Sequence, residues 1–311
     1  MPERPFSNLM RAIQEGKFVF TGELEPGKSA NVQPVVEEAL RLKRGGCVAG
    51  NVTQNPKADA CISSLAASHL IQQRAEFEVV YQLTVRDFNR MALVSEILGA
   101  HALGLRNILA LTGDHPACGD TPRSMPCYDL DSTHLVRLVR EMVDQHSAFG
   151  QKLKKKWGAF PELHVGCAGN PNADPLEPEV LKIGRKAGYA EFMQTQVVYD
   201  VETAIRFCKA VEKYKIPILM GIFPMKNYPT AKGFDMYVPG VSVPTEVLDA
   251  FKEVHKGGYD EATKAKKYDE LNVEFFAPLI QELKDKGLVA GIHVMAVQYA
   301  RVIPMLMERL K

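Results

Sequence analysis

Short apolar runs recur along the chain, and each is followed by a polar turn and then by a stretch with helical periodicity. Apolar runs without polar alternation are typical of strands that are buried on both faces, as in parallel sheets. Strand starts lie 26–30 residues apart in five of seven intervals, about one strand–helix unit. The pattern predicts an α/β fold, a (β/α)8 TIM barrel with strands over residues 18–23, 47–52, 77–83, 107–112, 164–168, 192–196, 218–222 and 291–295.

The segments between these strands each carry one apolar face and predict the outer helices. In the first of them we expect Asn31 to cap the helix and Gly45 with Gly46 to end it. A doubly wound sheet is the alternative, but no GxGxxG motif follows any strand. We predict helices over residues 31–44, 57–74, 87–103, 131–149, 174–187, 201–214 and 296–310.

Two intervals between strands are long, and we expect them to hold the extra structure. The first contains a loop at residues 115–130. The second follows strand seven, and we expect it to hold a Pro/Gly-rich loop and two extra helices within residues 226–287. The active sites of barrels lie on the face that carries such loops. We treat residues 1–311 as a single barrel domain that leaves no room for a second redox domain.

Composition narrows the class of protein. The chain is 46% hydrophobic, and its 38 Lys and Arg nearly balance its 37 Asp and Glu, which excludes the basic excess of a nucleic-acid binder. No apolar run approaches the roughly 18 residues of a membrane helix, and the N-terminus lacks a signal peptide. The six cysteines form no CxxC pair. We therefore expect a cytoplasmic protein without a membrane span or a nucleic-acid partner.

Residues 22–29, GELEPGKS, match the phosphate-binding pattern GxxxxGK[ST] after a strand. Three features oppose that interpretation. Glu23 and Glu25 would repel a phosphate, Pro26 removes one N–H donor, and Pro34 would fall inside the helix that such a loop must open. A P-loop nucleotidase acting through Gly22 to Ser29 remains an alternative function.

Polar residues follow the predicted strands at their C-terminal ends, where barrel enzymes carry their chemistry. Glu23 and Asp114 form a carboxylate pair that can face a ligand across the barrel mouth. The surrounding amides and hydroxyls suit a polar heterocycle better than a phosphate or a metal. No metal-ligand spacing is present, and we place His115 and His255 on loops. The other polar strand-end residues are Asn51, Thr53, Gln82, Thr84, Thr112, Asn170, Gln194 and Gln196.

Four segments, GELEP, LALTGDHP, TQVVYD and IPILMGIFP, resemble the methylenetetrahydrofolate reductase family in order and spacing, over about residues 18–295. The resemblance implies a flavin-binding barrel that reduces 5,10-methylenetetrahydrofolate to 5-methyltetrahydrofolate by hydride transfer from the reduced flavin N5. Glu23 then takes the place of the general acid that protonates the folate N10. Asp114 takes the place of the aspartate near flavin and folate.

The resemblance also implies binding residues. Gln196 matches the residue that contacts the pterin, and Gln194 lies on the same side of the strand. Thr53 matches a threonine that contacts the flavin. Asn170, at the end of strand five, is also predicted to bind the cofactor. The other cofactor-binding residues implied are Gln82, Thr84, Thr112, Gly113 and Asp114.

Some positions depart from the family pattern. Thr112 replaces an arginine and Gln82 a histidine, so the flavin is left open between FAD and FMN. Glu25, Val197 and Val198 replace aromatics that stack on NADH. The pattern resembles a divergent branch found in anaerobes, in which a cysteine-rich partner subunit accompanies the reductase.

The electron donor is therefore NADH or a partner subunit. We expect such a subunit to dock through the loops at 115–130 or 226–245, and we expect the chain to form an oligomer. A flavin-free, pterin-binding subunit of a methyl transferase is a further alternative function.

Overall fold

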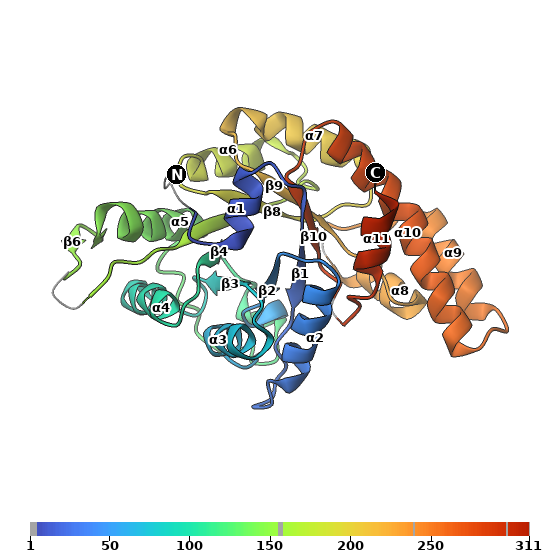
Figure 1. The fold of residues 1–311 in the computed structure, drawn as a ribbon, viewed down its shortest axis with the longest axis horizontal. Helices are drawn as coiled ribbons and strands as arrows, with labels where there is room; N and C mark the ends of the chain where they lie inside the picture. The colour runs from blue at the N-terminus through green and yellow to red at the C-terminus, as the bar shows by residue number, and fades with distance from the viewer. Residues whose placement is uncertain (1–4, 155–157, 239, 297, 311) are drawn as a thin grey trace.

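The chain is described by a computed structural model that covers residues 5–154, 158–238, 240–296 and 298–310. Within these residues eight parallel strands close into a barrel in the spatial order β1-β10-β9-β8-β7-β4-β3-β2, with helices around it (Figure 1). Every predicted strand overlaps one observed strand, which confirms the (β/α)8 barrel. The strands are β1 (Val19–Leu24), β2 (Ala49–Val52), β3 (Val79–Thr84), β4 (Asn107–Leu111), β7 (His164–Gly169), β8 (Phe192–Val197), β9 (Ile218–Ile222) and β10 (Gly291–Val294).

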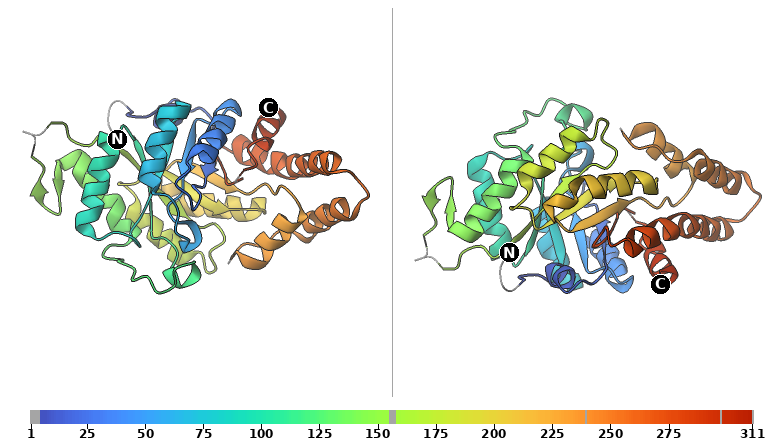
Figure 2. Two further views of the ribbon diagram at one scale, coloured as in Figure 1. Left: turned by 90° about the horizontal axis from the view of Figure 1, so that it is seen from below. Right: turned by 90° about the horizontal axis from the view of Figure 1, so that it is seen from above.

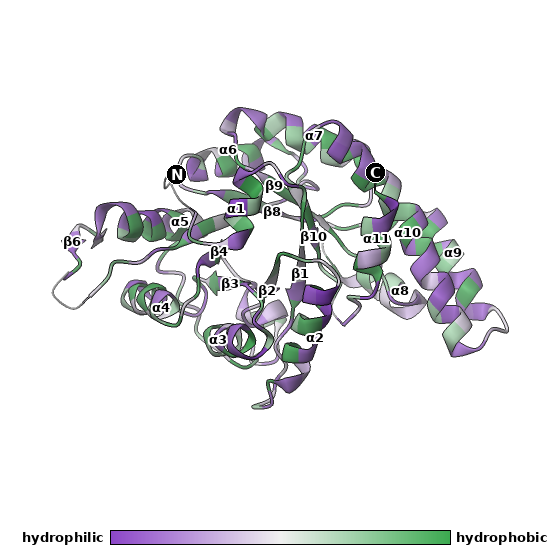
Figure 3. Ribbon diagram, viewed as in Figure 1, coloured by the Kyte–Doolittle hydropathy of each residue, from purple (hydrophilic) through white to green (hydrophobic). Residues whose placement is uncertain are grey.

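The helices that alternate with the strands form the outer layer of the barrel. Figure 3 shows apolar and polar residues alternating around these helices, as expected for elements with one buried face. They are α2 (Gln33–Arg44), α3 (Ser64–Ala75), α4 (Arg90–Ala102), α5 (Ser132–Arg140), α6 (Glu177–Lys186), α7 (Val201–Val211) and α11 (Val302–Arg309).

The prediction for the first of these helices is right in part. Gly45 is its C-cap, as expected. The N-cap prediction is wrong, because Val32 occupies that position and makes no side-chain cap. The Asn31 carboxamide oxygen instead accepts a hydrogen bond at 3.0 Å from the backbone N–H of Gln33, the first residue of the helix.

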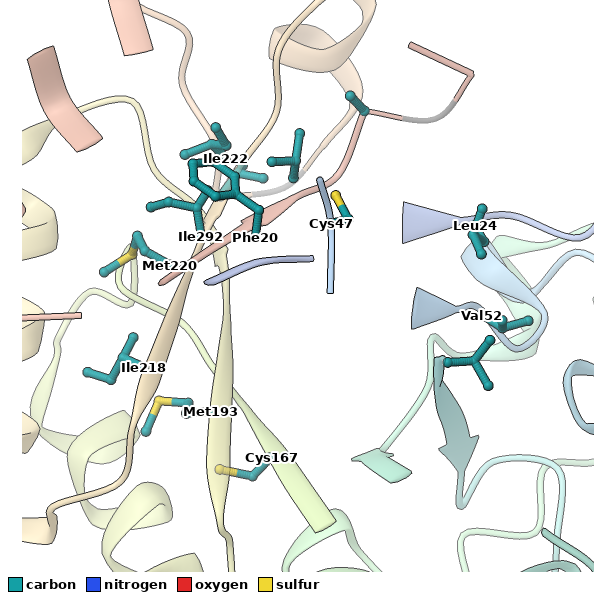
Figure 4. Packing of buried hydrophobic residues seen from close by; sticks show 14 of the residues in the cluster. Phe20, Leu24, Cys47, Val52, Cys167, Met193, Ile218, Met220, Ile222 and Ile292 are labelled. Carbon is teal, nitrogen blue, oxygen red and sulfur yellow. The ribbon is translucent and has the colours of Figure 1, made fainter. Parts of the chain in front are cut away.

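The main core lies between the strands and the helices. Ile218, Met220 and Ile222 occupy alternate positions of β9, and all three belong to one large buried cluster (Figure 4). Successive residues of a strand point to opposite faces, so these three side chains share one face, the helix-covered outside of the barrel. Leu219, between two of them, belongs to a second cluster on the inside.

The inward positions change character along each strand. At the N-terminal end they are Val19, Ala49, Val80 and Phe192, which join a second apolar cluster. Two and four residues further on, the same faces carry polar residues: Thr21 and Glu23, Asn51 and Thr53, Gln82 and Thr84, and Gln194 and Gln196. The barrel is therefore closed by apolar packing at one end and lined by polar groups at the other.

An N-terminal helix not expected from the sequence completes the apolar end. Leu9, Met10 and Ile13 of α1 (Asn8–Gln14) are buried in the second cluster. The Glu78 carboxylate accepts hydrogen bonds from the Asn8 and Leu9 backbone N–H groups, at 2.7 and 2.9 Å. The helix covers the bottom of the barrel, which leaves the mouth as its polar end.

The prediction of two helices within residues 226–287 is wrong, because the described part of this segment contains three. They are α8 (Tyr228–Tyr237), α9 (Thr245–Lys256) and α10 (Glu261–Asp285), and α9 and α10 project as an arm beyond the barrel (Figures 1 and 2). Pro229, one of the prolines that indicated a loop, stands in the first turn of α8, where a missing backbone N–H is harmless. The side chain of Asn227 caps that helix. His255 lies in α9, so its placement on a loop is also wrong.

Other predicted boundaries shift where the chain turns. The helix predicted for residues 131–149 ends early, in a π-helical turn (Glu141–Gln145) that leads into a hairpin of β5 (Ser147–Ala148) and β6 (Gln151–Lys152). Of the helices in the described residues, none combines the length and apolar character that a bilayer crossing requires.

Candidate active site

A cavity of about 730 Å³ opens at the C-terminal ends of the strands. All ten residues predicted for the site line it, from six of the strand ends or the loops that follow them. They are Glu23, Thr53, Gln82, Thr84, Thr112, Gly113, Asp114, Asn170, Gln194 and Gln196. The fold therefore brings the predicted set together, including the two carboxylates of Glu23 and Asp114.

Glu23 has a buried histidine behind it. The side chain of Glu23 is 20% exposed, and its Oε2 lies 3.7 Å from Nε2 of His293, which is 2% exposed. The other ring nitrogen of His293, Nδ1, lies 3.0 Å from the Thr21 hydroxyl. Thr21, His293 and Glu23 thus lie in a row from the barrel interior to the mouth. Only the Thr21–His293 contact is within hydrogen-bond distance, because the 3.7 Å between His293 and Glu23 exceeds it.

Glu25 stands outside this line and is exposed. Loss of solvent around its carboxyl group raises the pKa of Glu25, and repulsion from Glu23 adds to the effect. The repulsion arises because like charges disfavour one another.

The wall formed by β2 and β3 holds an unsatisfied hydroxyl. Thr53 is 4% exposed, and its Oγ1 has no hydrogen-bond partner among the described residues. A buried polar atom without a partner is unfavourable, and a ligand in the cavity can supply one. The Thr84 hydroxyl differs, because it donates to the Asp87 carboxylate at 3.0 Å.

Gln194 is paired across the barrel. Its Nε2 donates to Oδ1 of Asn51 at 3.0 Å, and the Asn51 amide donates back to Gln194 Oε1. This reciprocal pair forms part of the cavity floor. Gln196 lies nearer the mouth, where its Oε1 accepts a hydrogen bond from the Val197 N–H at 2.9 Å.

The turn after β4 allows close approach to the cavity. Gly113 has φ +85°, a left-handed conformation that other residues adopt only with strain, and a Cβ there would lie 3.1 Å from Cβ of Arg86. The Arg86 guanidinium donates to the Asp114 carbonyl at 3.2 Å. Arg86, two residues after the end of β3, therefore lies beside this turn. It is the same turn at which Thr112 stands where the resemblance implies an arginine.

Val197 and Val198, interpreted above as lost stacking positions, are not among the residues that line the cavity. Both are fully buried in the main core, and Val197 follows Gln196 onto the outward face of β8. An aromatic group instead follows the ends of β8 and β9. The rings of Phe223 and Phe234 stack with centroids 3.9 Å apart, and the Tyr199 hydroxyl donates to the Phe223 carbonyl at 3.0 Å.

The segment that matches the phosphate-binding pattern does not have the corresponding geometry. Gly22 and Glu23 lie within β1, and α2 begins only at Gln33, four residues after Ser29. A phosphate-binding loop must open directly into a helix N-terminus. The structure therefore contradicts the nucleotidase interpretation.

Several residues of the cavity were missed in the sequence. They include three basic residues of α6, the loop residue Lys57, and above all His293 and Arg86. Strand periodicity could have identified the last two, since His293 lies in a predicted strand and Arg86 is two residues after Thr84. The α6 residues Lys182, Arg185 and Lys186 resemble an ordinary solvated helix end, and no local signal distinguishes them. Among the described residues, no three His, Cys, Asp or Glu side chains gather into a potential metal site.

The comparisons of this sequence with known proteins agree on one family. The sequence profile of the methylenetetrahydrofolate reductase family matches residues 8–311. The chain is 27% identical over 302 residues to a probable methylenetetrahydrofolate reductase (NADPH) of Caenorhabditis elegans, covering 92% of this chain and 41% of that protein. It is 24% identical over 312 residues to methylenetetrahydrofolate reductase 2 of Schizosaccharomyces pombe, covering 97% and 46%. The chain spans less than half the length of these two relatives.

Among solved structures, the chain is similar to an F420-dependent secondary alcohol dehydrogenase in complex with an F420-acetone adduct. The TM-score is 0.56 at 11% identity, with 95% of this chain and 99% of that chain covered. At this identity the likeness concerns the barrel fold alone. Because the family profile matches nearly the whole chain, this protein belongs to the methylenetetrahydrofolate reductase family.

Proposed function

We propose that the chain, as one flavin-binding unit, reduces 5,10-methylenetetrahydrofolate to 5-methyltetrahydrofolate. The observation that carries the proposal is the position of Glu23, which reaches the barrel mouth with the buried His293 behind it. An acid is needed there, because the folate ring must open before its methylene carbon can be reduced. Family membership supports the substrate class.

The cavity suits a flavin. Its volume of about 730 Å³ lies within the usual range for small-molecule sites, roughly 300–1,000 Å³. The unpartnered Thr53 hydroxyl offers a hydrogen bond to a polar ring edge, and Gly113 lets the backbone approach closely. We propose that the ring is held by Thr53, Gln82, Thr84, Thr112, Gly113, Asp114 and Asn170.

The residues of the chain have separate tasks in this reaction. When bound and reduced, a flavin supplies the hydride that the methylene carbon receives. Glu23 donates a proton to the folate N10, and after product release a water in the open cavity returns a proton to Glu23, either directly or through His293, which also lines the cavity. Asp114 stabilises positive charge on the opened folate. Gln196 binds the pterin, and Gln194 supports it from the cavity floor.

We further propose that electrons reach this site through a cysteine-rich partner subunit rather than directly from NADH. Two exposed segments support this route. Residues 115–130 expose Met125, and residues 226–245 expose Met236 and Tyr237, all of them large apolar side chains. Residue 239 of the second segment lies outside the described residues. Large exposed apolar side chains are common where a partner docks.

The flavin content of the purified protein tests the cofactor directly. We expect a yellow protein with about one flavin per chain, and chromatography of the released cofactor distinguishes FAD from FMN. A colourless protein that takes up neither flavin would overturn the oxidoreductase proposal. If that protein still binds tetrahydrofolate, the flavin-free methyl-transfer alternative is favoured.

Glu23→Gln tests the acid. The carboxamide keeps the size of the side chain but cannot donate the proton, so we expect bound flavin to be retained and turnover to fall about 10²–10⁴-fold. Reduction of the flavin by an artificial donor serves as the control and should be unaffected. Turnover of methylenetetrahydrofolate at the wild-type rate would show that Glu23 is not the acid.

A further inference from the structure

Two adjacent residues after β3, Arg86 and Asp87, form an ion pair at the edge of the cavity. The guanidinium donates from Nε to Asp87 Oδ1 at 2.7 Å and from Nη2 to Oδ2 at 2.8 Å. Arg86 is 3% exposed. This two-pronged geometry is among the strongest that side chains make, and it fixes both groups in orientation.

The pair connects the loops that follow three neighbouring strands. Nη1 of Arg86 donates to the Asp114 carbonyl after β4, at 3.2 Å. Oδ2 of Asp87 accepts from the side-chain amides of Gln54 and Asn55 after β2, each at 3.2 Å. The loops after β2 and β4 are thereby fastened to the end of β3.

The loop after β2 needs such support, because its backbone is strained. Asn55, Lys57 and Ala58 have φ of 43°, 57° and 61°, a left-handed conformation that is unfavourable for residues other than glycine. From the other side Gly119 packs so closely that a Cβ there would lie 2.0 Å from the Ala58 carbonyl oxygen. The conformation persists because neighbouring loops hold it.

The fastened loops line the cavity. Gln54 and Lys57 border it on one side, and Gly113 and Asp114 border it on the other. Burial opposes ionisation of Asp87, but the hydrogen bonds and charge of Arg86 outweigh it and lower the pKa of Asp87 below its usual 3.8. The pair is therefore ionised at neutral pH.

We propose that Arg86 and Asp87 are a positioning pair that holds residues 54–58 and 112–114 in the conformation that binds the flavin. This inference rests on the proposed function only in naming the flavin as the ligand. It assigns the pair no contact with reacting atoms. Its consequence is that flavin affinity depends on the two-pronged geometry and not on positive charge alone.

Arg86→Lys separates these two properties, because lysine keeps the charge but cannot bridge Asp87 and the Asp114 carbonyl with a fixed fork. Arg90→Lys is the matched control. Arg90 also pairs with an aspartate, Asp129, at 3.1 Å, but both side chains are exposed and lie at the start of α4. The measurements are amide hydrogen exchange without added ligand and the dissociation constants of FAD and FMN by fluorescence quenching.

In Arg86→Lys we expect exchange at residues 54–58 and 112–114 to accelerate at least about tenfold, as the loss of charged hydrogen bonds implies. Flavin should bind at least about tenfold more weakly, while exchange in β7 to β9 and both readouts in Arg90→Lys stay at wild-type values. Unchanged exchange in the two loops would overturn the proposal, and so would acceleration spread evenly over the barrel. A wild-type protein that binds neither flavin refutes the proposed function, and the exchange measurement still tests the pair.

Discussion

At the scale of single residues, the central feature is the line from Thr21 through His293 to Glu23. β1 and β10 pair in parallel with Thr21 opposite His293. Side chains at paired positions of neighbouring strands lie on the same face, and Glu23 follows two residues later on that face. The register between the first and the last strand therefore sets the environment of the proposed acid.

His293→Asn tests this arrangement. The shorter amide cannot carry a proton to Glu23, so we expect turnover to fall at least about tenfold, while Glu23 keeps its own role as acid. The dependence of the rate on pH should also change, because the imidazole that exchanges protons with Glu23 is gone. Stopped-flow measurement of flavin reoxidation by methylenetetrahydrofolate from pH 5 to 9 checks both. Bound flavin serves as the control, and an unaltered pH profile would contradict a role in proton exchange.

At the scale of elements, each helix must begin close to the strand end that precedes it. Asp200, three residues after the end of β8, is the N-cap that starts α7. Its carboxylate accepts hydrogen bonds from the N–H and the hydroxyl of Thr203, at 2.8 and 2.6 Å. The bonds from Thr203 hold the pKa of Asp200 below its usual 3.8. The ionised cap thus stabilises the helix start directly beside the strand that carries Gln196.

The stabilisation by Asp200 should depend on pH. A lowered carboxyl pKa contributes stability that is fully present above about pH 4 and is lost as the pH falls through the folded-state pKa. We expect Asp200→Ala to lower the free energy of unfolding by about 0.5–2 kcal/mol at pH 7 and by less below pH 3. Urea unfolding at several pH values measures this. Asp200→Asn keeps the cap and should remove only the pH dependence, and an Ala effect that is constant with pH would contradict the assignment.

At the scale of the whole molecule, the two ends of the barrel differ in character. Leu9, Met10 and Ile13 of α1 cover one end, and the polar cavity opens at the other. The arm of α9 and α10 extends from the barrel without contributing a residue to the described lining of that cavity (Figure 2).

The proposed electron route gives a prediction for the intact protein. Rapid mixing of the oxidised chain with NADH should leave the flavin absorbance unchanged over seconds, because the partner subunit is missing. An artificial one-electron donor should bleach it under the same conditions, which controls for an accessible and redox-active flavin. Rapid bleaching by NADH alone would contradict the partner proposal and leave the proposed reductase activity intact.

Sequence periodicity was sufficient for the barrel and for grouping strand-end residues at its mouth, but it missed cavity residues such as His293 and Arg86. Buried parallel strands produce short apolar runs at regular intervals, and their C-terminal ends meet at one rim, so strand-end residues such as Glu23 and Asp114 could be grouped without a structure. Helix boundaries were less well determined. Part of residues 226–287 was interpreted as a Pro/Gly-rich loop, although Pro229 stands in the first turn of α8 and Gly233 lies within that helix.

The hydrogen-bond partners of the strand residues at the site depended on the tertiary structure. The Thr21–His293 contact spans 272 positions and the Asn51–Gln194 pair spans 143, so both exist only because the barrel closes in one register. The register shift between β8 and β9, and the meeting of three loops at Arg86 and Asp87, are likewise absent from local patterns. Periodicity reports which face of an element a residue occupies, whereas hydrogen-bond partners are set by how distant elements align.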